Sequence, residues 1–498
     1  MTSKDESNTT KAPLLSLASL TPPSNAFDTI PSEIISTFFR FSIHPSSLKD
    51  IFGNSLNWNV DPEDPAPTQL NLVAVCRRWR QIALNDPHLW NEISIRLNKD
   101  TPYSTVSGFE QWLSRSGTLP LSIRLDFVPI PKFSDYELYQ PQFSITDSLV
   151  GSLLTLASRV ATLYLRLPTN SIHNLHRPCE WSLLKAASIE YIAWCSNSEL
   201  VKSFRFGEPL NFDDAPQLQH FRLSSCYFEH VTASWANITQ FNGRKFSPSE
   251  CLRILQAAPQ LCRCSLEEIS KGRDEDWDLL PTVVHPSLIH LILDDIPSHT
   301  WDYMSCPKLQ TLEVSLLDYP LANGPIEFLR RSQCPLKTLI FAEDSGRLDG
   351  LIEFLELTPA LEWLTVPTIE EDVLQHLADT TYYSEIDKES PFLPNLQSLH
   401  LNGFRRFAWS YIPAIAPIKS PKFSKNLRRP LFFIVFFIEL EEGDAGIIDR
   451  SSLEDIIEAI NAGVDLHVQG PEAQFPKDLV LGSMDFHGID LGSLTRRQ

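Results

Sequence analysis

The sequence predicts an α/β protein in two parts: a small helical module near the N-terminus, then a long array of short parallel strands with helices and loops outside. Three observations predict this. Apolar residues recur at helical spacing within residues 30–84. From about residue 100 helical and extended stretches alternate, which is typical of a parallel sheet. One apolar phrase then returns seven times between residues 216 and 401.

Composition and charge exclude several classes of function. The 498 residues include 42 Lys+Arg and 62 Asp+Glu, a net charge of −20, and the basic residues are scattered. A nucleic-acid or anionic-membrane surface needs a basic patch, so we expect neither partner. Glycine is scarce, with 18 residues, and the sequence contains no glycine-rich phosphate loop, nucleophile elbow or zinc-protease motif. We therefore expect no cofactor and no catalytic residues.

Cysteines and apolar segments indicate an intracellular protein. The nine cysteines stand mostly alone beside apolar residues, and the pair Cys262 and Cys264 has the wrong spacing for zinc. We expect nine free thiols and no metal site, because Asp294 and Asp295 also lack further ligands. No secretory signal precedes the module, and the longest apolar run, residues 431–438, is far shorter than the ~20 residues of a membrane span. We expect a buried strand there, and a protein of the cytoplasm or nucleus.

The N-terminal elements follow in order. Residues 1–26, rich in Ser, Thr and Pro, predict a disordered tail ahead of a module at residues 27–97. A first helix is expected to start at residues 30–33, where Pro31 suits the first turn. Residues 44–67 are acidic and proline-rich, which predicts an inserted loop. A second helix is expected from about Thr68 to Leu84, followed by a strand ending at Leu97.

The recurring phrase has the form L-x-x-L-x-L, where L is any apolar residue, and each copy predicts one strand. The leading prolines are Pro216, Pro259, Pro286, Pro307, Pro335, Pro359 and Pro394. They are 21 to 43 residues apart, and residues 160–165 hold a weaker copy. Capping signals at Ser247, Thr368 and Ser451 predict helices between strands.

The pattern resembles leucine-rich repeats, whose period is 20–29 residues. Only Cys226 stands where that family carries Asn or Cys after the last leucine. The resemblance implies an irregular leucine-rich-repeat-like α/β solenoid over residues 98–498, with a parallel sheet and helices or loops outside. The alternative is an α/β protein whose short strands happen to follow prolines.

Residues 30–97 resemble the F-box. The start IPSEII at residues 30–35 and Phe38 are similar to the family's first helix, and VCRRWR at residues 75–80 is similar to its second. Pro87, Leu89 and Trp90 match its end. The resemblance covers about 70 of the 498 residues. The layout is similar to that of fungal F-box proteins with an irregular leucine-rich array.

This resemblance implies a non-catalytic role in protein interaction. F-box proteins dock to the S-phase-kinase-associated adaptor of SCF-type E3 ubiquitin ligases, next to the cullin scaffold, and the rest of the chain selects a protein target. The adaptor contacts carried over are Ile30, Pro31, Ile34, Ile35, Phe38, Val75, Cys76 and Trp79. The alternative for each is packing inside the module. Arg77, Arg78 and Arg80 are expected to form a solvated helix face.

The array offers a second surface, since residues flanking the inward leucines of each strand point to the open side of the sheet. They are His220, Arg222, Arg263, His290, Glu313, Trp363 and His400. Their mixed charge, together with the imidazoles and the indole, is typical of a surface that contacts a protein target. The alternative is that these residues occupy ordinary solvated positions of the sheet. Two other functions stay open: a non-degradative F-box scaffold and an α/β enzyme of unrecognised class.

Overall fold

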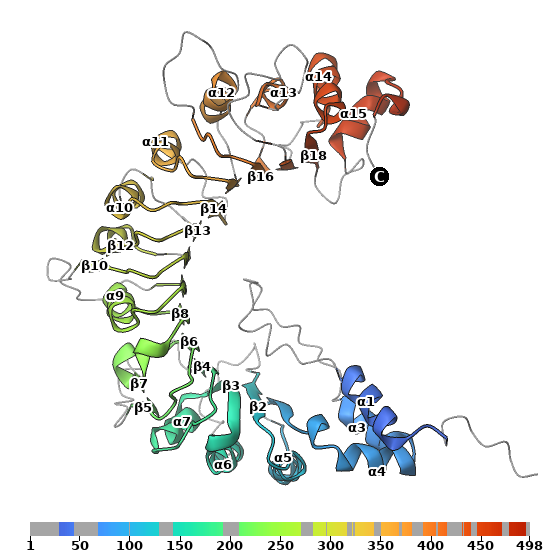
Figure 1. The fold of residues 1–498 in the computed structure, drawn as a ribbon, viewed down its shortest axis with the longest axis vertical. Coiled ribbons are helices and arrows are strands. Elements are labelled where there is room, and N and C mark those ends of the chain that lie inside the picture. Colours follow the sequence, from blue (N-terminus) through green and yellow to red (C-terminus); the bar gives the residue numbers. More distant parts are fainter. Residues whose placement is uncertain are drawn as a thin grey trace, which may run out of the picture.

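The chain forms an α/β structure around one parallel sheet that curves as an arc (Figure 1). The computed structural model describes residues 29–43, 68–98, 100–128, 143–192, 209–269, 282–294, 296–315, 321, 324–342, 350–367, 371–380, 392–404, 407–415, 431, 433–439, 446–470 and 478–494. The expected tail at 1–26, the inserted loop at 44–67, Thr368 and Asp295 lie outside these residues.

The sheet has 14 strands, and their spatial order is their order along the chain. They are β1 (Glu92–Leu97), β2 (Leu121–Phe127), β3 (Val160–Pro168), β4 (Ala186–Ile192), β6 (His220–Ser224), β8 (Gln240–Arg244), β9 (Arg263–Glu267), β11 (His290–Asp294), β13 (Thr311–Ser315), β14 (Thr338–Phe341), β15 (Trp363–Val366), β16 (Ser398–Phe404), β17 (Phe433–Glu439) and β18 (Asp465–Gln469). Each proline-led phrase supplies one of these strands, as predicted.

Helices and short 3-10 turns carry the chain back along the outer side of the arc (Figure 1). The helices are α5 (Ser104–Arg115), α6 (Phe143–Leu154), α7 (Thr169–Ile172), α9 (Pro248–Ala257), α10 (Pro325–Ser332), α11 (Leu351–Glu356), α12 (Glu371–Asp379), α13 (Tyr411–Ile415), α14 (Arg450–Asn461) and α15 (Leu479–His487). Two small parallel pairs, β5 (Leu210–Phe212) with β7 (Val231–Ala233) and β10 (Val283–Val284) with β12 (Met304–Ser305), complete the outer layer.

The core lies between the sheet and these outer elements. In-register pairing aligns one apolar residue from every strand into a continuous row whose members are at most 3% exposed. The row is Ile93, Ile123, Leu163, Ala187, Phe221, Phe241, Cys264, Leu291, Leu312, Leu339, Leu364, Leu399, Ile434 and Leu466. A second row runs two residues further along each strand, because side chains alternate between the two faces; it is buried except in β1, where Ile95 is half-buried. The intervening residues form the open, concave face.

The apolar phrase does not predict β4 and β8, which have no leading proline. In β8, Gly243 stands where the neighbouring strands place Leu223 and Leu266 in the second buried row. A Cβ at Gly243 would lie 2.7 Å from Cε1 of Phe241 and 3.1 Å from Cδ2 of Phe246. The two aromatic rings fill the volume that a leucine would occupy. The second row of the core is therefore filled at β8, although Gly243 breaks the apolar pattern in the sequence.

The N-terminal module packs α1 (Ser32–Ser42), α3 (Thr68–Val75) and α4 (Arg77–Asn85) around a core of its own. The expected single helix from Thr68 to Leu84 is wrong, because the backbone is extended at Cys76. The Cys76 thiol accepts a hydrogen bond from the Trp79 N–H at 3.4 Å and so caps α4. The Arg80 guanidinium donates to the Val73 carbonyl at 2.9 Å, satisfying one acceptor left free at the end of α3.

The capping signals have mixed outcomes. Ser247 and Glu250 form the expected capping box at the start of α9. Ser451 does not cap α14, because the helix begins one residue earlier and Asp449 accepts from the Ser452 N–H at 3.0 Å. A carboxylate at the N-cap also favours the positive end of the helix dipole.

Eight of the nine cysteines lie within the described residues, and all eight are free thiols. Burial raises the pKa of Cys226 and of Cys306 to about 12, which keeps both thiols protonated at neutral pH. Among the described helices, none has the length and hydropathy needed to cross a membrane.

The core row gives a direct test of the fold. Leu312 is fully buried between Leu291 and Leu339, whereas its neighbour Thr311 lies on the open face. We expect Leu312→Ala to lower the free energy of unfolding by about 3 kcal/mol, since it leaves a cavity in the core. Thr311→Ala should change it by less than about 0.5 kcal/mol. Urea unfolding followed by circular dichroism measures both, and equal effects would contradict the assigned faces.

Candidate protein-interaction surfaces

The outer side of α1 presents a stripe of exposed apolar side chains. Ile34, Phe38 and Phe41 are 48%, 65% and 81% exposed, and their spacing places them on one helix face. The end of α3 adds Val75, which is 59% exposed, and the exposed Cys76. Apolar surface on so small a module is typical of a site that another protein covers.

The module's interior accounts for the other expected contact residues. Ile35 is buried, and Phe39 lies 4.9 Å from Trp79 between ring centroids. Trp79 and Ile30 are partly buried against this core, while Pro31 is exposed at the N-cap of α1. Of the eight residues suggested by the resemblance, the structure therefore brings five to the surface: Pro31, Ile34, Phe38, Val75 and Cys76.

Two of the three arginines of α4, Arg77 and Arg80, are exposed as expected, and Arg78 is half-buried. Arg78 donates a hydrogen bond to the Ile30 carbonyl, and Arg80 donates to the Val73 carbonyl while remaining exposed. These two side chains tie α4 to the start of α1 and to α3. Their role is to fix the helix arrangement that displays the apolar stripe.

A buried carboxylate, Asp86, clamps α1 onto the module. Arg40 donates to its two oxygens at 2.8 and 2.9 Å, Ser36 also donates, and the His88 N–H donates at 3.1 Å. Burial opposes ionisation of Asp86, but these hydrogen bonds outweigh it and hold its pKa below the ordinary value. The sequence does not reveal this clamp, since the two side-chain donors, Arg40 and Ser36, are 46 and 50 residues away from Asp86.

Tryptophans join the module to the sheet. Trp90 is fully buried, and Trp112 of α5 meets it edge-on with ring centroids 5.1 Å apart. Trp112 packs against both the module core and the sheet core, and the Arg115 guanidinium lies 4.8 Å over the Trp90 ring. In addition, β1 pairs directly with β2. The module therefore has a fixed position at one end of the arc (Figure 1).

The concave face carries all seven residues expected for target binding. His220, Arg263, His290 and Trp363 share one cross-strand row, and Arg222, Glu313 and His400 share the next open row. Their exposure varies: Trp363 is 38% exposed, whereas Arg222 is 6% exposed. Burial lowers the pKa of Arg222, with Glu267 and Glu190 acting in the opposite direction.

From β2 to β9 the concave face holds a ladder of paired charges that the sequence pattern missed. Arg124 contacts Asp126 at 3.0 Å, and Arg166 contacts Glu190 at 3.2 Å. Further along, Asn242 donates to Glu267 at 2.9 Å. Arg124 and Asp126 pair within β2, whereas the other two pairs bridge neighbouring strands, as cross-strand pairs do.

From β15 to β18 the same face carries an aromatic patch, formed by Trp363, His400, Phe433, Phe437 and His467. The Trp363 and His400 rings stack with centroids 4.3 Å apart. Phe433 lies 5.2 Å from His400 and 6.2 Å from His467, also between ring centroids. Phe437 is 44% exposed. The apolar run at residues 431–438 predicted a buried strand, and the exposed aromatics arise because β17 has one face open.

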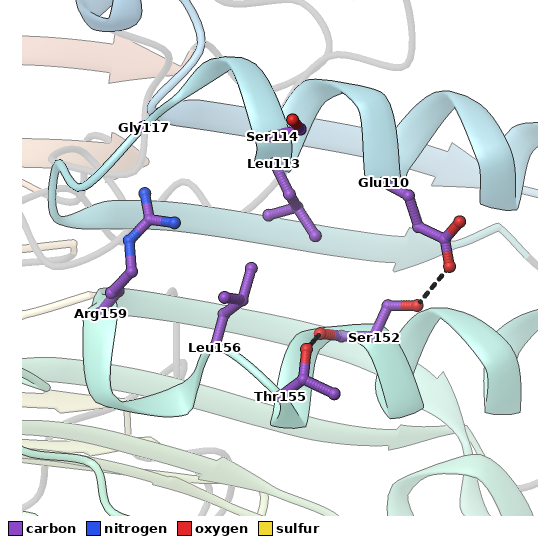
Figure 2. Close-up of a pocket in the computed structure, with 8 residues that line it drawn as sticks. All are labelled: Glu110, Leu113, Ser114, Gly117, Ser152, Thr155, Leu156 and Arg159. Carbon is purple, nitrogen blue, oxygen red and sulfur yellow. Dashed lines mark hydrogen bonds between the residues drawn. The ribbon is translucent and has the colours of Figure 1, made fainter.

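The outer side has a hollow of about 340 Å³ between α5 and the end of α6, lined in part by Glu110, Ser152 and Arg159 (Figure 2). Ser152 donates to Glu110 at 3.2 Å, and Arg159 donates to the Leu119 carbonyl at 2.8 Å. These polar groups pair within the protein. Nor do the described residues contain three or more His, Cys, Asp or Glu side chains placed to hold a metal ion.

Two comparisons with known proteins found no match. No family model matches this chain, and a search of curated proteins returned no match. Any inference about function therefore rests on the sequence motifs and on two surfaces, the exposed stripe of α1 and the concave face of the sheet.

The Asp86 clamp can be tested by hydrogen exchange. We expect Asp86→Ala to lower the protection of the α1 amides by about 30-fold, the equivalent of about 2 kcal/mol, because it leaves Arg40 and the His88 N–H without their acceptor. A pKa lowered in the folded state stabilises the module above pH ~4, and this contribution is lost as the pH falls further. Asp100→Ala, at an exposed site, is the control. Unchanged protection in Asp86→Ala would refute the clamp.

Proposed function

We propose that this chain is the substrate-recognition subunit of an SCF-type E3 ubiquitin ligase. Its module is an F-box that docks to the S-phase-kinase-associated adaptor, and its array is an irregular leucine-rich-repeat-like solenoid whose concave face binds a protein target. The chain itself performs no catalysis. It acts in the cytoplasm or nucleus by holding the target near the cullin scaffold.

The exposed stripe of α1 carries this proposal. Ile34 and Phe38 belong to the segment that resembles the F-box start, and both are largely exposed although the module has a complete apolar core without them. Val75 and Cys76, from the VCRRWR segment, are exposed as well. An amphipathic helix face of this kind fits an apolar groove on a partner. The motif and the exposed side chains therefore support the same contact surface.

The arrangement of the two parts also supports a receptor role. The Trp90–Trp112 contact and the β1–β2 pairing fix the module against the array, so a target on the concave face would be held at a defined distance from the adaptor. A non-degradative scaffold would use the same docking. Ubiquitylation of a co-purified protein in a reconstituted complex separates these two roles.

Adaptor docking is tested with Ile34→Asp combined with Phe38→Asp. We expect loss of detectable binding, because burying two unpaired carboxylates in an apolar interface costs several kcal/mol. Pull-down with purified adaptor measures binding, and circular dichroism reports the fold. Adaptor bound to the wild-type chain should also slow alkylation of the exposed thiol of Cys76, read by mass spectrometry.

The matched control places two carboxylates at exposed apolar positions far from α1. Val284 and Phe486 are 63% and 66% exposed, so Val284→Asp with Phe486→Asp should bind the adaptor like the wild type. Failure of the wild-type chain to bind the adaptor would overturn the proposal. Unfolding of the Ile34→Asp, Phe38→Asp variant would show that these side chains stabilise the module instead.

A further inference from the structure

The concave face changes character along the arc. Its strands from β1 to β9 include six arginines at open positions: Arg96, Arg124, Arg166, Arg222, Arg244 and Arg263. The strands from β11 to β18 contain no lysine or arginine. Their open positions hold instead the carboxylates of Asp294, Glu313 and Asp465, together with the aromatic patch. The second half of the face is therefore acidic and aromatic.

The aromatic patch is arranged to accept an apolar group. The Trp363 N–H already donates to the Thr365 hydroxyl at 3.0 Å, so the indole needs no further polar partner. In register, Trp363 lies between Thr338 and Ser398, and one face of its ring stacks on His400 while 38% of the residue stays exposed. Such a rigid, partly exposed indole is typical of a binding hot spot.

Two of these carboxylates lie on β11 and β13, and β14 separates them from the patch. Glu313 and Asp294 are on neighbouring strands of the same face, and burial raises the pKa of Glu313, with Asp294 adding to the effect and Arg263 opposing it. Trp363 lies two strands away from Glu313 and two residues back along the strand, because Glu313 is in register with Thr365; their backbones are therefore about 12 Å apart. A cation beside Glu313 would relieve the repulsion between the two carboxylates and favour their ionised forms.

We infer that the target segment recognised by this half of the face is basic and aromatic, with a lysine or arginine against Asp294 and Glu313 and an aromatic side chain against Trp363 and Phe433. The charge of the face selects the cation. A polyproline II segment presents side chains at i and i+3 on one side, about 9 Å apart, and the length of a lysine or arginine side chain covers the remaining few ångströms of the separation of about 12 Å. This inference rests on the proposal that the concave face binds the target, but it does not require adaptor docking.

Fluorescence polarisation with labelled 12-residue peptides tests it on the full chain. The probe is three repeats of Lys-Pro-Pro-Phe, and the controls replace every Lys by Glu or every Phe by Ser. An interface this small is weak, so we expect micromolar binding of the probe and at least tenfold weaker binding of both controls. Raising the salt from about 50 to 500 mM should weaken probe binding severalfold.

Variants of the chain locate the site. We expect Trp363→Ala, and Asp294→Asn combined with Glu313→Gln, each to weaken probe binding at least fivefold. Glu458→Gln makes the same kind of change at an exposed position of α14 and should have no effect. All these variants should still bind the adaptor. Failure of the wild-type chain to bind the probe would refute this inference and leave adaptor docking standing.

Two results would overturn the inference. Equal binding of the probe to all variants would show only general attraction to a chain of net charge −20. Sedimentation that detects a dimer dissociated by Trp363→Ala would show instead that the patch is covered by a second copy of the chain.

Discussion

The in-register pairing of parallel strands is the constraint on which the other features depend. Because side chains alternate along a strand, alignment of Leu291 with Leu312 and Leu339 places every second residue of each strand in the core and the others on the concave face. A slip of one residue would bury His290 and expose Leu291. The core row thus determines which residues a partner can reach, and it brings Trp363, His400 and Phe433 together from three separate strands.

The module is stabilised by a small apolar core together with polar side-chain interactions. Its small core of Ile35, Phe39, Leu72, Ala83, Leu89 and Trp90 is supplemented by polar ties, chiefly Asp86 with Arg40 and Arg78 with the Ile30 carbonyl. These polar interactions hold α1 in place without using its outer apolar residues, so Ile34 and Phe38 remain exposed to a partner. The Trp90–Trp112 contact fixes the module against the sheet.

Sequence reasoning predicted the α/β class, the parallel sheet and the seven phrase-led strands, because a period-2 apolar pattern reflects burial directly. It missed β8, where the rings of Phe241 and Phe246 replace a leucine at Gly243, and it joined α3 to α4 because a thiol cap at Cys76 has no distinctive sequence signal. The resemblance grouped Ile34 with Ile35, and only packing separates the exposed side chain from the buried one. The cross-strand pairs of the charge ladder and the stacking of Trp363 on His400 join residues 24 or more apart, which no local pattern contains.

The central claim is that the module docks to the adaptor while the array remains available for a target. Size-exclusion chromatography with light scattering on the purified chain mixed with purified adaptor tests this most directly. We expect a complex of one chain with one adaptor, which still binds the basic–aromatic peptide with unchanged affinity. Two separate peaks, each with the mass of a single component, would contradict the account.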